Sequence, residues 1–256
     1  MKNIISLYLL VLVTSCSEHV PNMIGAYSMT GQILNNGGLD SAVPRKQLKI
    51  FTDKYVMFAS NTLTDSSAVY GIGTYESKPG KVVEHIFYSS ANGDKKDTFE
   101  LKIDTTTTGF KQVINRITTN GKTYKLTEDY KKISKAGTSP LDGAWKQVQN
   151  IYITAKGDSS VNKTPVEFKV YEGGYFIWAI TAKDSANNNA SVFGYGNFTM
   201  EGNNRSIETV RNSSFLSGLV GRTYAVDIEF PTADSYKQTI TFANGDKSIE
   251  IYEKLK

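Results

Sequence analysis

Apolar and polar side chains alternate with a period of two along most of this chain. Residues 48–50 read Leu-Lys-Ile, and residues 168–170 read Phe-Lys-Val. Such alternation is typical of a β-strand with one buried face and one face in water. Beyond the first residues, no stretch keeps a helical period for more than about two turns. The pattern therefore predicts an all-β protein.

The alternating pattern is present twice. Residues 47–59 and residues 167–179 match in chemical class at nearly every position outside their turns, 120 positions apart. Further matching runs follow at offsets between 118 and 126, which places small insertions in loops. Residues 136–140, Ala-Gly-Thr-Ser-Pro, separate the two copies and are typical of a linker. An internal repeat of this length predicts two domains of the same fold.

Turn signals divide each copy into eight strands. Asn-Gly at 120–121 and Gly-Gly at 173–174 supply the positive φ that tight hairpins need. Eight sequential antiparallel strands lose their exposed edges when they close into an up-and-down barrel. We therefore predict two tandem eight-stranded barrels. The expected strands are 25–32, 46–51, 55–60, 68–76, 82–90, 97–104, 110–118 and 122–132, then 143–153, 165–171, 175–181, 191–200, 205–212, 221–229, 235–242 and 247–255.

The first residues predict export. Residues 1–3 are a short basic start, residues 4–13 are apolar, and the segment ends at Cys16. An apolar run of this length is too short for a mature transmembrane helix and fits an export signal. The small residue before Cys16 resembles a bacterial lipobox, which implies that Cys16 is lipidated; the alternative is a plain secretory signal in which Cys16 is incidental. Because Cys16 is the only cysteine, an internal disulfide is excluded, which favours the lipid anchor.

These boundaries give the expected organisation of the whole chain. We predict a lipoprotein signal peptide at 1–15, a lipidated tether at 16–22, one barrel at 23–136 and a second barrel at 137–256. An N-terminal lipid would attach the protein to a membrane of the bacterial cell envelope, and we expect the outer membrane. Whether the barrels face the periplasm or the outside stays open.

The charge pattern argues against a nucleic-acid partner. Without the signal peptide the chain has 28 basic and 25 acidic side chains. Residues 22–137 have a net charge of +5, and residues 138–256 have a net charge of −1. Nucleic-acid binding needs a concentrated stripe of Lys and Arg, so we expect no nucleic-acid partner.

Residues for catalysis and metal binding are scarce. The histidines are His19, in the predicted tether, and His85. With Cys16 lipidated, no thiol is free as a nucleophile, and two histidines are too few for a His/Cys metal site. His85 follows Glu84 in an alternating strand, so the two side chains point to opposite faces. We therefore expect no enzyme activity, no metal and no cofactor.

The opening of the second copy carries a family resemblance. Residues 143–145 read Gly-Ala-Trp, which resembles the Gly-x-Trp signature of lipocalins. The wider pattern, including the hairpin, the Gly-x-Gly-Thr-Tyr strand and the closing Tyr-x-Lys-apolar strand, is similar to lipocalin-like lipoproteins of Gram-negative bacteria with no assigned role. In lipocalins a basic side chain of the last strand covers the tryptophan that closes the barrel. The resemblance therefore implies that Lys254 covers Trp145, and that Lys132 covers Tyr27, where the first copy lacks the tryptophan.

Hairpin pairing predicts which side chains share a face. With a two-residue turn at 173–174, Lys169 opposes Trp178 and Val170 opposes Ile177. We assign the apolar set to the lumen and the other set to the outside, where aromatic side chains need a cover. A three-residue turn would exchange the faces. The expected ligand-wall residues, which could instead be plain core, are Tyr55, Met57, Tyr175 and Ile177, and the expected outer interface residues are Phe51, Phe58, Tyr171, Phe176 and Trp178.

Two functions follow from this picture. The first is a membrane-tethered, non-catalytic binding lipoprotein that holds a small apolar or amphipathic ligand in a barrel, since a barrel of eight strands has room for one small ligand. The alternative is a protein-interaction lipoprotein, such as an inhibitor or assembly accessory, that binds an envelope protein through the outer aromatic residues. An open apolar lumen favours the first function, and a packed lumen favours the second.

Overall fold

The computed structural model describes residues 20–62, 68–119, 121–163, 165–185 and 188–256. The predicted signal peptide, Cys16 and most of the predicted tether lie outside the described residues, so the lipid anchor stays a prediction.

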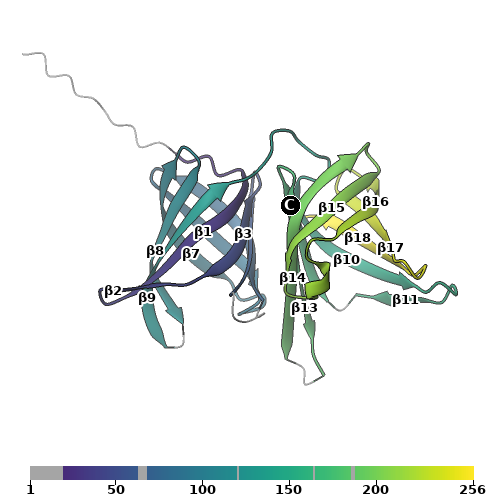
Figure 1. Ribbon diagram of the computed structural model, residues 1–256, viewed down its shortest axis with the longest axis horizontal. Helices are drawn as coiled ribbons and strands as arrows, with labels where there is room; N and C mark the ends of the chain where they lie inside the picture. Colours follow the sequence, from purple (N-terminus) through teal and green to yellow (C-terminus); the bar gives the residue numbers. More distant parts are fainter. Residues whose placement is uncertain (1–19, 63–67, 120, 164, 186–187) are drawn as a thin grey trace, which may run out of the picture.

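The first half of the chain closes into a barrel, here called barrel 1. The strand order is β2-β1-β3-β4-β5-β6-β7-β8-β9, and β1 also pairs with β9, which completes the ring (Figure 1). All these pairings are antiparallel. The strands are β1 (Gly25–Asn36), β2 (Leu39–Ala42), β3 (Arg45–Phe51), β4 (Tyr55–Thr62), β5 (Val69–Lys78), β6 (Lys81–Ser89), β7 (Asp97–Thr106), β8 (Gly109–Thr119) and β9 (Lys122–Lys132).

The second half repeats this topology as barrel 2. The order is β11-β10-β12-β13-β14-β15-β16-β17-β18, and β10 pairs with β18. The predicted all-β fold of two closed eight-stranded antiparallel barrels is therefore confirmed, with β2 and β11 as additions. The strands are β10 (Gly143–Ile153), β11 (Ser159–Asn162), β12 (Val166–Glu172), β13 (Tyr175–Lys183), β14 (Asn189–Glu201), β15 (Arg205–Ser213), β16 (Thr223–Thr232), β17 (Ser235–Thr241) and β18 (Lys247–Lys254).

Strands β2 and β11 were not expected from the sequence. Each pairs with the far part of the first strand of its barrel, and all four residues of each are exposed. A strand without a buried face has no reason to alternate apolar and polar residues. Its sequence therefore looks like a loop.

One end of each barrel is closed by a lysine over an aromatic ring. In barrel 2 the Nζ atom of Lys254 lies 5.4 Å from the centroid of the Trp145 ring. Gly143 makes room for this lysine, because a Cβ atom there would lie 2.9 Å from Lys254 Cε. In barrel 1 the Nζ atom of Lys132 lies 5.7 Å from the ring centroid of Tyr27. Both contacts are the ones that the resemblance to lipocalins implied.

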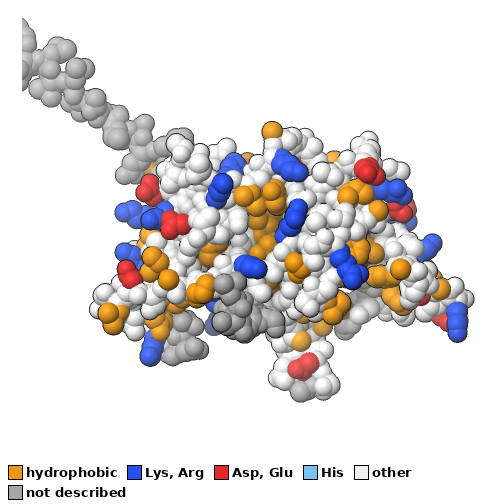
Figure 2. All heavy atoms as spheres, viewed as in Figure 1, with side chains coloured by type: hydrophobic (Ala, Val, Ile, Leu, Met, Phe, Trp, Pro, Cys, Tyr) orange, Lys and Arg blue, Asp and Glu red, His pale blue; other side chains and the backbone are white. Residues whose placement is uncertain are grey.

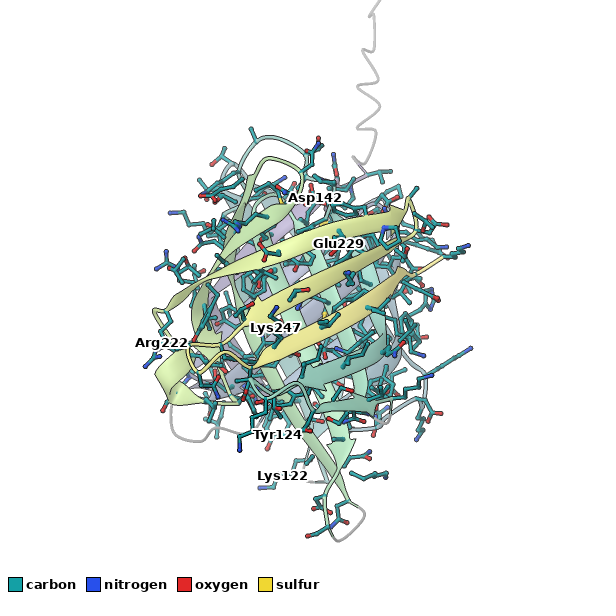
Figure 3. All side chains as sticks on the ribbon, turned by 90° about the vertical axis from the view of Figure 1, so that its right-hand side faces the viewer. Lys122, Tyr124, Asp142, Arg222, Glu229 and Lys247 are labelled. Carbon is teal, nitrogen blue, oxygen red and sulfur yellow. The ribbon has the colours of Figure 1, made fainter. Side chains whose placement is uncertain are left out.

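The two ends of barrel 2 lie far apart in the view of Figure 3. Asp142, just before β10, lies near the closed end at the top of this view. Arg222, just before β16, lies lower, towards the other end. The short 3₁₀ helix η1 (Ser217–Leu219) comes directly before Arg222 in the chain. This segment therefore lies at the end of barrel 2 opposite to the closed end, here called the open end.

An apolar core lies between the two barrels. Strands β3, β4 and β5 face β12, β13 and β14, which are the equivalent strands of the other copy. Figure 2 shows the two halves in continuous contact, with apolar side chains along the seam. Buried members of this shared core include Ile50, Met57, Val170, Ile177 and Phe193, all 0% exposed. Burial this complete makes the two barrels one packed unit.

Candidate functional site

The hairpin of β12 and β13 pairs as expected, with its faces reversed. Lys169 pairs with Trp178 and Val170 pairs with Ile177 across the two-residue turn at 173–174. Val170 and Ile177, however, lie in the core between the barrels, whereas Lys169 and Trp178 line the lumen of barrel 2. The register of a hairpin fixes which side chains share a face, but it does not say which face turns inward.

The predicted faces of the site residues are therefore wrong. Each apolar face packs against an equally apolar face of the other copy, so the lumens can hold charged side chains that pair with one another. Tyr55, Met57 and Ile177 are buried between the barrels, and Tyr175 packs against the same core, while Phe51, Phe58, Tyr171, Phe176 and Trp178 belong to the lumens.

A buried ion pair lies in the lumen of barrel 1. The Nζ atom of Lys49 on β3 lies 2.6 Å from Glu84 Oε1 on β6. Lys49 Nζ also donates a hydrogen bond of 3.1 Å to Gln112 Oε1 on β8. All three side chains are almost fully buried. A buried charge is costly unless it is paired, and Lys49 and Glu84 compensate each other's charge in this way.

Glu128 is the second carboxylate of this lumen. It accepts hydrogen bonds from Gln32 Nε2 at 2.6 Å, from Tyr130 Oη at 3.0 Å and from Gln112 Nε2. Gln47 Nε2 in turn donates to Tyr130 Oη. Every donor therefore has its own acceptor while Glu128 is ionised. Burial raises the pKa of Glu128, and these hydrogen bonds partly oppose the rise.

Barrel 2 repeats the buried ion pair with one addition. Lys169 Nζ lies 3.1 Å from Glu208 Oε1 and donates a hydrogen bond of 3.1 Å to Gln238 Oε1. Tyr171 Oη donates a further hydrogen bond of 2.7 Å to Glu208 Oε1. The matching position in barrel 1 is Phe51, which has no hydroxyl. Glu208 therefore has a second partner that Glu84, its counterpart, lacks.

A carboxylate pair distinguishes barrel 2 from barrel 1. Tyr252 Oη lies 2.6 Å from Glu167 Oε1 and 2.7 Å from Glu250 Oε2. A hydroxyl has a single hydrogen and cannot donate to both carboxylates. Gln147 Nε2 donates to Glu167 at 2.6 Å, and Gln238 Nε2 donates to Glu250 at 2.5 Å. One of the two carboxyl groups must therefore carry a proton to complete this arrangement.

The electrostatics agree with a shared proton. Burial raises the pKa of Glu167 to about 8, and the nearby charge of Glu250 adds to the rise. Barrel 1 has the neutral Gln47 at the matching position, 120 residues earlier. One Glu in place of one Gln therefore gives barrel 2 a carboxyl pair that needs a proton, whereas Gln47 of barrel 1 donates a hydrogen bond at the matching position.

Each lumen holds a cavity beside its polar groups, with a volume of about 250 Å³ in barrel 1 and about 320 Å³ in barrel 2. In barrel 2 the polar part of the lining consists of three carboxylates, Lys169, Asn150 and Gln238, and the remaining wall is largely apolar. The apolar lining comprises Trp178, Ile180, Val210, Phe215, Leu216, Leu219, Tyr224, Val226, Ile240 and Phe242. A largely apolar pocket with a few converging polar groups is the usual form of a small-molecule site.

The segment around η1 borders the barrel 2 cavity at its open end. Phe215 contributes its ring to the lining while the residue is 55% exposed. The ring lies edge-on to Trp178, with 6.4 Å between the centroids. Leu216, 53% exposed, and Leu219 line the same side. The cavity therefore has an apolar rim that reaches the surface.

The sequence interpretation missed the polar clusters because it assigned Lys49 and Lys169 to a wet face. A signal for them exists in the repeat itself. Solvated charges have no reason to recur at matching positions of two copies, whereas charges that pair inside a barrel do. The recurring positions are Lys49 and Lys169, Glu84 and Glu208, Gln112 and Gln238, and Glu128 and Glu250.

His85 lies apart from both lumens. Its Nδ1 atom lies 3.2 Å from Thr98 Oγ1 in an exposed contact, while the neighbouring Glu84 points into barrel 1. Among the described residues, no group of three or more His, Cys, Asp and Glu side chains could hold a metal ion. No helix within the described ranges has the length and apolar character to cross a membrane.

Comparisons with known proteins give similarity at the level of the barrel. No protein-family model and no curated protein matches the chain. A lipocalin-like protein from Bacteroides uniformis matches with 19% identity and a TM-score of 0.31, over 46% of this chain and 100% of that chain. A redesigned β-barrel matches with 13% identity and a TM-score of 0.29, over 46% of this chain and 93% of that chain. The strand order and closure described above show a closed, up-and-down antiparallel barrel, built twice.

Proposed function

We propose that this protein is a membrane-tethered, non-catalytic binding protein that holds a small amphipathic ligand inside a barrel. The observation that supports it is the barrel 2 cavity, which combines an apolar wall with buried polar groups and opens at an apolar rim. The ligand would place its apolar part against Trp178 and Phe215 and its polar part near Glu167. Binding of this kind needs no nucleophile and no metal.

The tether is part of this proposal and rests on the sequence. Lipidation at Cys16 would attach the barrels to a membrane of the bacterial envelope, and we place them at the outer membrane. Anchors with two or more acyl chains hold stably, where a single chain binds reversibly. Cys16 comes nine residues before Gly25, where β1 begins, so a tether of this length would keep barrel 1, and barrel 2 packed against it, close to the lipid surface.

The surface proposed for the protein-interaction alternative does not lie on the outside of the protein. It placed Phe58 and Trp178 on the outside, and both line a lumen. The face opposite to them is already covered by the other barrel. The ligand-binding function therefore has the stronger support.

Native mass spectrometry of the mature protein, purified from its own envelope, tests the proposal. Two matched variants locate the ligand: Ile240→Trp fills the barrel 2 cavity, and Ile114→Trp fills the barrel 1 cavity at the equivalent position. We expect a bound small molecule on the wild type that is absent from Ile240→Trp and present on Ile114→Trp.

Two results would overturn the proposal. One is wild-type protein that carries no small molecule and binds none from an extract of its own envelope lipids and metabolites. The other is a molecule that stays bound to the double variant with both cavities filled. Circular dichroism of each variant checks that the added tryptophan has not unfolded the barrel.

A further inference from the structure

We propose that barrel 2 selects an amphiphile with a cationic amine head, and that barrel 1 has no such preference. This inference rests on the proposed function, because it concerns the ligand of the same cavity. It follows from a charge imbalance that only one of the two lumens has.

The barrel 2 cavity has more acidic than basic groups. Its lining includes one basic side chain, Lys169, and three acidic ones, Glu167, Glu208 and Glu250. Lys169 is engaged by Glu208 and Gln238. Among the described residues, no Lys or Arg forms an ion pair with Glu167 or Glu250. The lumen therefore has a place for one more positive charge.

Barrel 1 is balanced by comparison. Its cavity lining has two basic side chains, Arg45 and Lys49, and two acidic ones, Glu84 and Glu128. Gln47 occupies the position of Glu167 and donates its own hydrogen bond to Tyr130. Among the described residues of this lining, a cation entering barrel 1 would meet one carboxylate outside an ion pair, Glu128, where barrel 2 offers two.

The carboxylate pair lies where a ligand from the open end would meet it. β12 begins at Val166 on the open side and ends at Glu172 beside the closed end, so Glu167 lies nearer the opening than Lys169. In the same cavity, the apolar rim of Phe215 and Leu216 offers a surface for a hydrocarbon chain. An ammonium head with a short apolar tail therefore matches both parts of the cavity.

An ammonium group would replace the proton that the carboxyl pair shares. Three N–H donors of a primary ammonium can reach both carboxylates, whereas the Tyr252 hydroxyl can serve one. On binding at neutral pH the pair would release one proton to solvent while the ammonium enters, so the charge of the lumen stays constant. The ionisable groups around Glu167 are Glu250 and Tyr252 on β18, Lys169 and Tyr171 on β12, Glu208 on β15, Tyr236 on β17 and Tyr70 of barrel 1.

Three probes with eight carbon atoms each test this inference: octylamine, 1-octanol and sodium octanoate, titrated into the mature protein at pH 7 by calorimetry. We expect octylamine to bind at least about tenfold more tightly than octanol, with octanoate weakest. Glu167→Gln should abolish the preference for octylamine, and Gln47→Glu should create a second octylamine site in barrel 1. The same titration in buffers of different ionisation enthalpy should show one proton released per octylamine.

The results separate this inference from the proposed function. If octanol binds and octylamine binds no better, or if Glu167→Gln keeps the preference, the cationic selectivity is wrong while ligand binding stands. If none of the three probes binds to a folded protein, the proposed small-ligand site fails as well. Circular dichroism confirms folding of Glu167→Gln, whose barrel 1 counterpart is already glutamine.

Discussion

The two lumens of this protein are built from the same arrangement of strands, but they differ in the protonation of their buried carboxyl groups. Both hold a buried Lys-Glu-Gln cluster at matching positions. Barrel 1 completes its hydrogen bonds with Glu128 ionised, whereas barrel 2 needs a proton between Glu167 and Glu250. Duplication of a stable barrel thus allows one copy to change the charge of its interior while the fold is kept.

Replacement of the buried lysine should give the largest loss of stability. It tests whether the Lys-Glu-Gln cluster common to both lumens stabilises the barrels. Lys169→Met leaves Glu208 buried without a cation, which should lower the free energy of unfolding by about 3–5 kcal/mol. Urea denaturation followed by Trp fluorescence measures the loss. Lys237→Met, at the partly exposed pair with Glu229, should cost at most about 1 kcal/mol. An equal loss in both variants would contradict a structural role for the lumen pair.

The pH dependence of stability separates the two lumens. The folded pKa of Glu167 is raised above its ordinary value of 4.5 to about 8, so the folded chain holds a proton that the unfolded chain releases between these pH values. Its contribution is fully present below pH 4.5 and is lost as the pH rises through about 8, at no more than about 1.4 kcal/mol per pH unit.

Glu167→Gln should therefore make the unfolding free energy less dependent on pH between 5 and 8, and Gln47→Glu should make it more dependent. Burial raises the pKa of Glu172 to about 7, which keeps part of the dependence in both variants. Urea denaturation across this pH range measures it. A Glu167→Gln variant with an unchanged slope would show that the carboxyl pair holds no proton.

The hydroxyl of Tyr171 tests the extra hydrogen bond of barrel 2. Tyr171→Phe removes the donor to Glu208 and copies barrel 1, where Phe51 occupies this place. A hydrogen bond to a charged group contributes roughly 1.5–3 kcal/mol, so the variant should lose about that much. The reverse change, Phe51→Tyr, is the matched control and should gain less, because the surroundings of Phe51 were not built around a hydroxyl.

The closed ends should give the smallest effect. Lys254→Met removes the ammonium group above Trp145, and a cation over a ring at an exposed site contributes about 0.5–1 kcal/mol. Trp145 fluorescence in a Trp178→Phe background reports the change locally. Lys132→Met above Tyr27 should cost a similar amount, and a much larger loss at either end would indicate a contact beyond the ring.

The strands could be predicted closely, because turns and alternation are local properties. The expected segments 122–132 and 143–153 coincide with β9 and β10. The facing of the strands could not be predicted, because it depends on what covers each face. An apolar face such as that of Val170 and Ile177 looks like a barrel interior until the second copy is known to pack against it.

The packing of the two barrels against each other also determines the ratio in which the two cavities are made. Because equivalent strands of both copies bury each other, neither half can leave without exposing a broad apolar face to water. A cell that makes this polypeptide therefore obtains the neutral and the acidic compartment in a fixed stoichiometry of one to one, with no separate assembly step.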